Sequence, residues 1–160
     1  MPEYKVKAAF LYNFAKLTEW PAGTFADTNT PITIGILGRD PFGPQLEEIT
    51  RGKIVEGRAI VVTRFERVDE VRACQVLFIS NSESGRLSYI LSRLAGRPIL
   101  TVGEMRQFAG QGGAIGLVKQ GEEVHFEVNL DAVEASQLKL SSKLLRLAEI
   151  VRPNTKERKD

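Results

Sequence analysis

Short, unbroken runs of apolar and β-branched residues, separated by helical segments, constrain the fold of this chain more than any other feature. Residues 32–37 (ITIGIL) and 76–79 (VLFI) show almost no polar alternation. Strands of this kind are buried on both faces, which occurs in parallel sheets that are covered by helices on either side. Similar runs at 59–63 and 98–102 extend the pattern. The sequence therefore predicts an α/β fold, a single three-layer domain with a mostly parallel central sheet and flanking helices.

The N-terminal segment carries an amphipathic helical pattern. Apolar residues spaced by three or four positions predict a helix over 2–19, which Trp20-Pro21 closes because proline disfavours the helical conformation in the residue before it. The apolar stripe of this helix is expected to consist of Val6, Phe10, Phe14 and Leu17. Lys5, Lys7 and Lys16 are expected to lie off that stripe.

Turn and capping residues divide the remainder of the chain. Helices are predicted at 45–51, 68–72, 85–94, 104–108, 131–137 and 141–151, with Ser141 and Ser142 as caps of the last. Two strands at 114–118 and 124–130 predict an antiparallel edge hairpin across Gln120-Gly121. Connections are short, so we expect one domain over 1–152 and a polar C-terminal tail over 153–160.

Scarcity of cysteine and histidine excludes most conventional catalytic sites. The chain has one cysteine, Cys74, and one histidine, His125. Zinc sites need three or four ligands, so no metal site is predicted, and no cofactor is implied. His125 alternates with Glu123 and Glu127 on one face of a predicted strand, as an exposed sheet-face histidine does. We therefore expect no enzyme and no catalytic residues. A net charge of +2 gives no reason to expect nucleic acid.

Polar residues follow several predicted strands at what would be one edge of the sheet. Ligands bind at the carboxyl ends of strands in open α/β sheets, so these residues form a candidate small-ligand rim. The rim consists of Asp40, Ser80, Asn81, Ser82, Thr101 and Glu104. Helix capping is the competing interpretation, because Ser, Asn and Asp are the preferred N-cap residues. A hydrolase that uses Asp40, Glu83 and Glu104 as paired carboxylates is a third, weaker alternative.

Three further features have both a structural and a functional interpretation. The glycines of 35–38 and 110–113 match neither the dinucleotide fingerprint nor the P-loop, and favour turns with positive φ. Cys74 precedes a predicted strand and is expected to be a buried free thiol, with an intermolecular disulfide as the alternative. Segment 139–160 carries a net charge of +4 against −2 for the rest, and its surplus leucines suit a partner or a homodimer.

Seven segments, in consistent order over about residues 4–152, resemble the YfiR family. They are 4–16 (YKVKAAFLYNFAK), 18–21 (TEWP), 76–80 (VLFIS), 98–102 (PILTV), 108–113 (FAGQGG), 126–129 (FEVN) and 140–148 (LSSKLLRLA). The resemblance implies a small α/β protein of the bacterial periplasm, usually dimeric, that restrains a membrane-bound diguanylate cyclase by binding its periplasmic sensory region. It also implies that a signal peptide was removed and Met1 added. Cysteine is the departure, because this sequence keeps Cys74 alone, so the disulfides of YfiR do not carry over.

The resemblance leaves the partner surface and a second role open. On physical grounds the most apolar predicted helix, with its unbalanced positive charge, is the candidate interface, and we single out Leu145, Glu149 and Arg152. The alternative role is an extracytoplasmic small-ligand sensor that uses the rim and acts on another membrane signalling protein. The two roles are compatible, because a ligand can be the signal that releases the partner.

Overall fold

A mixed sheet with helices on both faces forms the centre of the molecule, and this confirms the predicted α/β class. The computed structural model describes residues 2–152. The predicted tail, 153–160, lies outside the described residues. Eight strands lie side by side in the order β10-β8-β7-β6-β5-β2-β4-β3. Their bounds are β2 Ile32–Leu37, β3 Ile54–Val55, β4 Arg58–Phe65, β5 Val76–Ile79, β6 Leu100–Gly103, β7 Ile115–Gln120, β8 Glu123–Asn129 and β10 Glu149–Val151.

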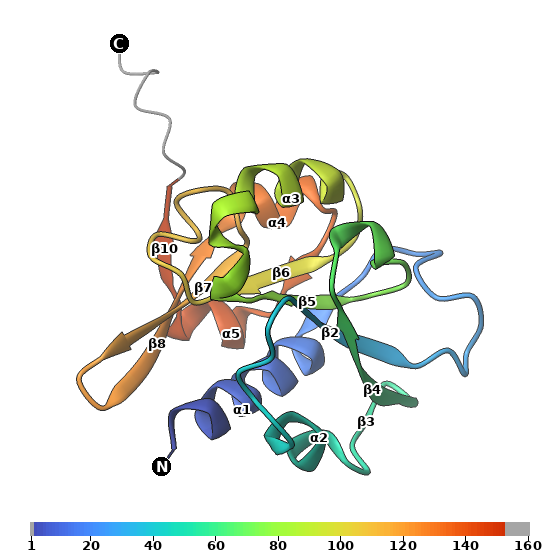
Figure 1. The fold of residues 1–160 in the computed structure, drawn as a ribbon. Coiled ribbons are helices and arrows are strands. Elements are labelled where there is room, and N and C mark those ends of the chain that lie inside the picture. The colour runs from blue at the N-terminus through green and yellow to red at the C-terminus, as the bar shows by residue number, and fades with distance from the viewer. Residues whose placement is uncertain (1, 153–160) are drawn as a thin grey trace.

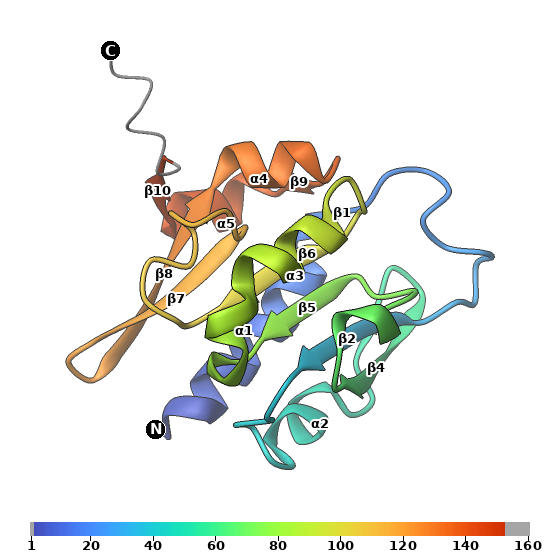
Figure 2. The same ribbon diagram turned by 45° about the horizontal axis from the view of Figure 1, so that its top comes forward.

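The middle of the sheet is parallel because β2, β4, β5 and β6 all run the same way. β7 and β8 form the predicted antiparallel hairpin, which extends away from the body of the molecule (Figure 2). β10 pairs parallel to β8 on its outer side, so the hairpin is not the last element at this edge. At the opposite edge, β3 pairs antiparallel to β4.

Helices cover the two faces of the sheet (Figure 1). α1 (Glu3–Lys16) and α2 (Gln45–Thr50) lie on one face, and α3 (Leu87–Leu94) lies on the other. The remaining elements are the 3₁₀ helices η1 (Val68–Glu70) and η2 (Asn81–Arg86), the helices α4 (Leu130–Ala135) and α5 (Ser142–Leu147), and a small separate ladder of β1 (Thr18–Glu19) with β9 (Lys139–Leu140). Ser141 caps α5 as predicted, because its Oγ accepts a hydrogen bond from Leu144 N at 3.1 Å. No helix in residues 2–152 has both the length and the hydropathy to cross a bilayer.

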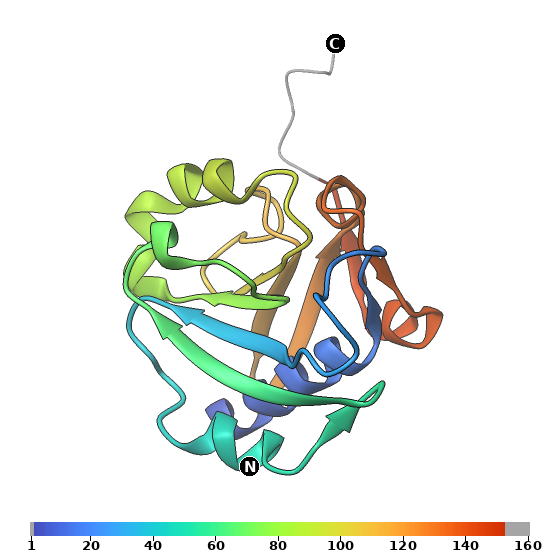
Figure 3. The same ribbon diagram turned by 90° about the vertical axis from the view of Figure 1, so that its right-hand side faces the viewer.

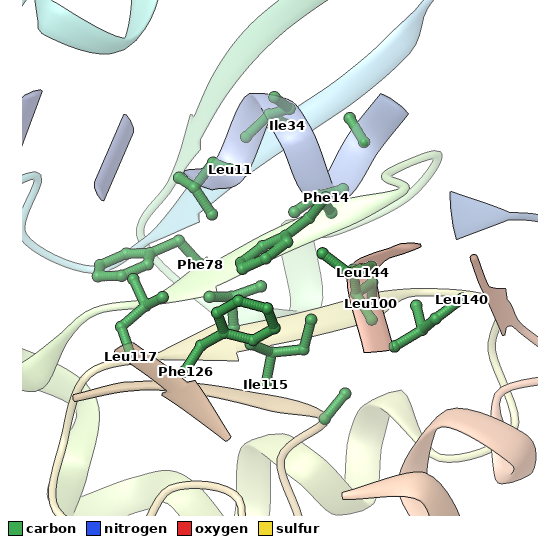
Figure 4. Close-up of a cluster of buried hydrophobic side chains, with 14 of the residues drawn as sticks. Leu11, Phe14, Ile34, Phe78, Leu100, Ile115, Leu117, Phe126, Leu140 and Leu144 are labelled. Atoms are coloured by element: carbon green, nitrogen blue, oxygen red, sulfur yellow. The ribbon is translucent and has the colours of Figure 1, made fainter. Parts of the chain in front are cut away.

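The main core lies between α1 and the sheet. Phe14 of α1 and Phe126 of β8 meet edge to face with ring centroids 5.3 Å apart, and Leu11 points at the same cluster (Figure 4). Phe42 and Phe78 make a similar contact at 5.0 Å. A second cluster, around α3 on the other face, includes Leu37, Leu77, Ile79, Ile90, Leu94 and Phe108.

The first helix differs from prediction in its length and its buried face. It ends at Lys16, because the next residues pair with the C-terminal segment, with Thr18 opposite Leu140. The buried residues of α1 are Lys7, Ala8, Leu11, Phe14 and Ala15. Of the predicted stripe only Phe14 is fully buried, and Lys7, expected outside, is in the core. The helix is apolar on more than one side, so spacing alone selects the wrong stripe.

Four other predicted helices need correction. Residues 104–108 form turns rather than a helix, and 85–94 divides into the end of η2 and α3. Segment 68–72 is one turn of 3₁₀ helix, η1. Segment 141–151 is helical only as α5, and then becomes strand β10, because pairing with β8 outweighs the helical preference of its leucines.

Candidate functional site

Polar side chains gather at the carboxyl edge of the parallel strands, as predicted for most of the rim. Asp40 follows β2, Ser80 and Ser82 follow β5, and Glu104 follows β6 directly. Thr101 is the exception, and its predicted place at the end of the strand is wrong. It lies within β6, and its Oγ1 accepts a hydrogen bond from Ala114 N at 2.9 Å.

The serines and the aspartate of the rim stabilise the loops that carry them. Ser80 caps η2 by accepting from Ser82 N at 3.3 Å, and Ser82 Oγ accepts from Arg39 N at 2.9 Å. Asp40 accepts from Phe42 N at 2.7 Å and from Arg64 Nε at 2.8 Å. These bonds account for the rim side chains as caps and loop anchors. Small-ligand binding at the rim stays a prediction.

Glu104 is the centre of a buried charged cluster that joins α1 to the sheet edge. Its carboxylate accepts from Lys7 Nζ at 2.5 Å, from the Tyr4 hydroxyl at 2.9 Å and from Asn81 Nδ2 at 3.5 Å. Lys7 Nζ also donates to Glu3 at 2.6 Å. The side chains of Lys7 and Glu104 are 4% and 6% exposed, so this is a buried ion pair.

Charge and burial act in opposite directions on this cluster. Burial alone would lower the pKa of Lys7, but the hydrogen bonds and charges of Glu104 and Glu3 outweigh it and raise that pKa. Burial, followed by the bond to Glu104, also raises the pKa of Tyr4, so its hydroxyl remains a donor. The cluster therefore holds its protons firmly, which suits a structural clamp rather than a proton-transfer site.

The three carboxylates considered for catalysis are separated by their partners. Glu104 pairs with Lys7, Asp40 with Arg64, and Glu83, which is buried, accepts two bonds from Arg86 at 2.9 and 3.0 Å. A paired-carboxylate mechanism needs two acids that act on one substrate atom, whereas each of these acids neutralises its own cation.

The remaining candidates for metal or acid–base chemistry also lie apart. His125 is exposed on β8 and faces Glu123 at 3.1 Å, which confirms the predicted sheet-face placement. Among residues 2–152, no three Asp, Glu, His or Cys side chains converge as a metal site would require.

The glycine segments are explained by close packing as well as by turns. Gly38 and Gly112 have φ of 96° and 116°, as predicted for turn glycines. Gly103 and Gly113 instead make room for the Phe108 ring, because a Cβ would lie 2.5 Å and 2.0 Å from it. The glycines of 108–113 therefore serve packing rather than phosphate binding, and we call Gly103, Phe108 and Gly113 the Phe108 lock.

Cys74 is a buried free thiol, as predicted. Burial raises its pKa to about 12, and the residue is 3% exposed within the α3-side core, so no thiol is presented at the surface to a second chain. At pH 8 the thiolate fraction is on the order of 10⁻⁴. We expect Ellman's reagent to leave the native protein unmodified and to modify one thiol per chain in denaturant. Rapid modification of the native protein would contradict this placement.

The predicted interface residues lie on two different elements. Leu145 is on α5 and is half-buried against the main core, while Glu149 is exposed on β10 and Arg152 is exposed just after it. The sequence indicated surplus apolar residues in this region but did not single out the two that are exposed, Leu147 at 71% and Ile150 at 48%. They are found only when the chain is known to leave the helix after Leu147.

Comparison with known proteins connects this architecture to a family. The YfiR/HmsC-like family matches residues 4–149, which is nearly all of the described chain. The chain belongs to the YfiR/HmsC-like family. A search of curated proteins finds no match.

Membership confirms the resemblance that the sequence motifs suggested. The YfiR/HmsC-like family is periplasmic and regulatory rather than catalytic, and is linked to signalling by diguanylate cyclases. The structure gives its motifs physical roles. Segment 4–16 supplies α1 with Tyr4 and Lys7, segment 108–113 supplies the Phe108 lock, and Asn129 caps α4 while donating to Ala109 O at 2.8 Å.

Proposed function

We propose that this chain restrains a membrane-bound diguanylate cyclase by binding the periplasmic sensory region of that enzyme, and so lowers cyclic-di-GMP output. The family match over residues 4–149 carries this proposal. The ion pairs that occupy Asp40, Glu83 and Glu104 support a binding protein over a hydrolase.

The surface that we propose for the cyclase lies at the β10 edge of the sheet. Leu147 and Ile150 are two of the most exposed large apolar residues described, and both lie within this short C-terminal stretch. Exposed apolar side chains close together at a sheet edge favour protein association. Glu149 and Arg152 flank them. We call Leu147, Glu149, Ile150 and Arg152 the β10 surface.

Charge at this edge indicates what the partner must supply. Glu149 is in register with Glu127 on the neighbouring strand, so two carboxylates lie side by side. Burial, and then the charge of Glu149, raises the pKa of Glu127. Like charges in register disfavour the pairing, and a basic group from a partner would relieve that repulsion. The β10 surface therefore suits a partner segment with apolar and basic residues.

Restraint requires that the protein bind the inactive cyclase more tightly than the active one. A shift from 1:99 to 99:1 needs about 5.5 kcal/mol of differential affinity. We propose that the protein acts as a symmetric dimer, because two copies of one surface on a dimeric cyclase accumulate this difference more readily than one.

The test is co-purification with a detergent-solubilised membrane diguanylate cyclase from the source organism. Leu147→Asp is expected to weaken the complex by about 10-fold to 100-fold, because it replaces the most exposed large apolar side chain of the β10 surface with a charge. Ile54→Asp is the matched control, since Ile54 is 61% exposed but lies on β3 at the opposite edge of the sheet. That variant is expected to bind like the wild type.

Two results would overturn this assignment. Absence of any complex with the wild-type protein rejects the cyclase partner. Equal binding by Leu147→Asp and the wild type rejects the β10 surface while leaving the partner in place.

A further inference from the structure

A pocket of about 680 Å³ lies at the amino ends of β2 and β4, the opposite edge from the predicted rim. Most of its lining residues come from the end of α1 with β1, from the connector that precedes β2, and from the segment that carries β9 and the start of α5. Figure 3 shows the ribbon from the side, with the connector leading into β2. The volume of the pocket lies within the range of small-molecule sites. Neither the rim nor the β10 surface contributes to it.

The pocket combines apolar walls with positively charged groups. Trp20, Phe25, Ile32, Val55 and Leu140 supply apolar and aromatic surface. The cations are Lys16, Arg58 and Lys139, against the acids Glu19 and Glu56. None of these five charges forms an ion pair with another residue of 2–152. One positive charge is therefore in excess at the pocket.

Arg58 is held in place before any ligand arrives. Its guanidinium lies 3.8 Å from the centroid of the Phe25 ring, and Nη1 donates to the carbonyls of Asp27 and Thr30 at 2.8 and 2.7 Å. Both bonds come from Nη1, and Nε and Nη2 donate no hydrogen bond to residues 2–152. A stacked guanidinium with unused N–H groups is a preorganised site for a carboxylate or a sulfonate.

Two buried polar atoms of pocket-lining residues have no partner in the described chain. They are Thr18 Oγ1 and Trp20 Nε1, and Thr18 as a whole residue is 7% exposed. Buried polar groups are nearly always hydrogen-bonded, so unpaired ones call for an explanation. Both atoms are closed to solvent, and both residues line the pocket.

We infer that this pocket binds a small organic anion with a flat apolar body, its acid group on Arg58 and its body between Trp20, Phe25 and Leu140. The positive excess favours an anion over a cation, and the aromatic walls favour an apolar body over a bare inorganic ion. This inference is independent of the cyclase, because binding is a property of the isolated chain.

Trp20 is the single tryptophan of the chain and provides a local readout. The probe is 8-anilinonaphthalene-1-sulfonate, an aromatic anion, and the signal is energy transfer from Trp20 to it. We expect saturable binding to one site per chain. Arg58→Gln should raise Kd by about tenfold or more, because a charge-assisted bond is lost. Arg51→Gln, at an exposed arginine outside the pocket, is the matched control and should leave Kd within about twofold.

Two further measurements keep the test decisive if Arg58→Gln fails to fold. Lys139→Gln removes an exposed pocket cation and should weaken binding with little change in Tm. N-phenyl-1-naphthylamine, the uncharged counterpart of the probe, should bind the wild type at least about tenfold more weakly. Three results would each overturn the inference. The first is equal affinity of the wild type for the two probes, and the second is equal affinity of the wild type and of the Arg58 and Lys139 variants for the anionic probe. The third is the absence of saturable energy transfer from Trp20.

Discussion

Lys7→Met is expected to lower the free energy of unfolding by about 3–5 kcal/mol, the cost of breaking a buried ion pair from one side. Lys7 and Glu104 are almost completely buried, and their atoms approach to 2.5 Å. Without the ammonium group, the Glu104 carboxylate remains buried with only the Tyr4 hydroxyl and the more distant Asn81 amide as donors. Urea denaturation of both proteins measures the difference.

Replacing both partners distinguishes a buried charge cluster from simple loss of packing. Lys7→Met with Glu104→Gln removes both charges while keeping the shape and an acceptor for Tyr4, so most of the lost stability should return. Arg67→Gln is a matched control at an exposed pair, Arg67–Glu70, and should change stability by about 0–1 kcal/mol. If Lys7→Met lowered the free energy of unfolding by as little as Arg67→Gln, the stabilising role of the Lys7–Glu104 pair would be contradicted.

The Lys7–Glu104 ion pair should make the stability of the protein depend on pH in the alkaline range. Because the folded-state pKa of Lys7 is raised, its contribution is fully present below the unfolded value of about 10.4 and is lost as the pH rises through the folded value. The stability difference between the wild type and Lys7→Met should therefore be constant from pH 7 to 9 and shrink at higher pH.

Gly113→Ala is expected to destabilise the protein by about 1–3 kcal/mol or more through overpacking. The new Cβ would lie 2.0 Å from the Phe108 ring, whose side chain is 1% exposed and cannot move without disturbing the core on the α3 face. Phe108→Ala should cost about 3–5 kcal/mol, because it removes the ring that the glycines accommodate. Thermal and urea unfolding of each variant measure these losses.

A control and a double variant complete that test. Gly85→Ala adds a Cβ into open space at a residue without positive φ, and should leave stability unchanged or slightly higher. Gly113→Ala combined with Phe108→Leu should lose less than the two single changes added together, because the smaller side chain relieves the clash. Additive losses of stability in the double variant would contradict the proposed packing of Gly113 against Phe108. So would a loss in Gly113→Ala no larger than that in Gly85→Ala.

Local sequence pattern predicted the central strands of the sheet well because β2, β5 and β6 are buried on both faces. β2 and β5 occur at the predicted residues, and the capping role of Ser141 was visible from its neighbours in the chain. These features depend on interactions within a few residues or on continuous apolarity. Each can be predicted from the element and the residues that flank it.

Contacts distant in sequence account for what the pattern missed. The burial of Lys7 depends on Glu104, which lies 97 residues later, so no helical periodicity can reveal it. β1 and β10 form because residues at opposite ends of the chain, or on a neighbouring strand, offer them hydrogen bonds. The exposed pair Leu147 and Ile150 follows from that change of element, and so does the shift of the proposed interface away from Leu145.

Restraint of a diguanylate cyclase by this protein would lower the rate of cyclic-di-GMP formation, and that rate can be measured in a reconstituted system. The measurement uses the full-length membrane cyclase in detergent or vesicles that leave its periplasmic region accessible, titrated with the purified protein. A saturable fall in rate is predicted, with Ile54→Asp as effective as the wild type and Leu147→Asp requiring about 10-fold to 100-fold more protein. A rate that stays constant at saturating wild-type protein would contradict the account.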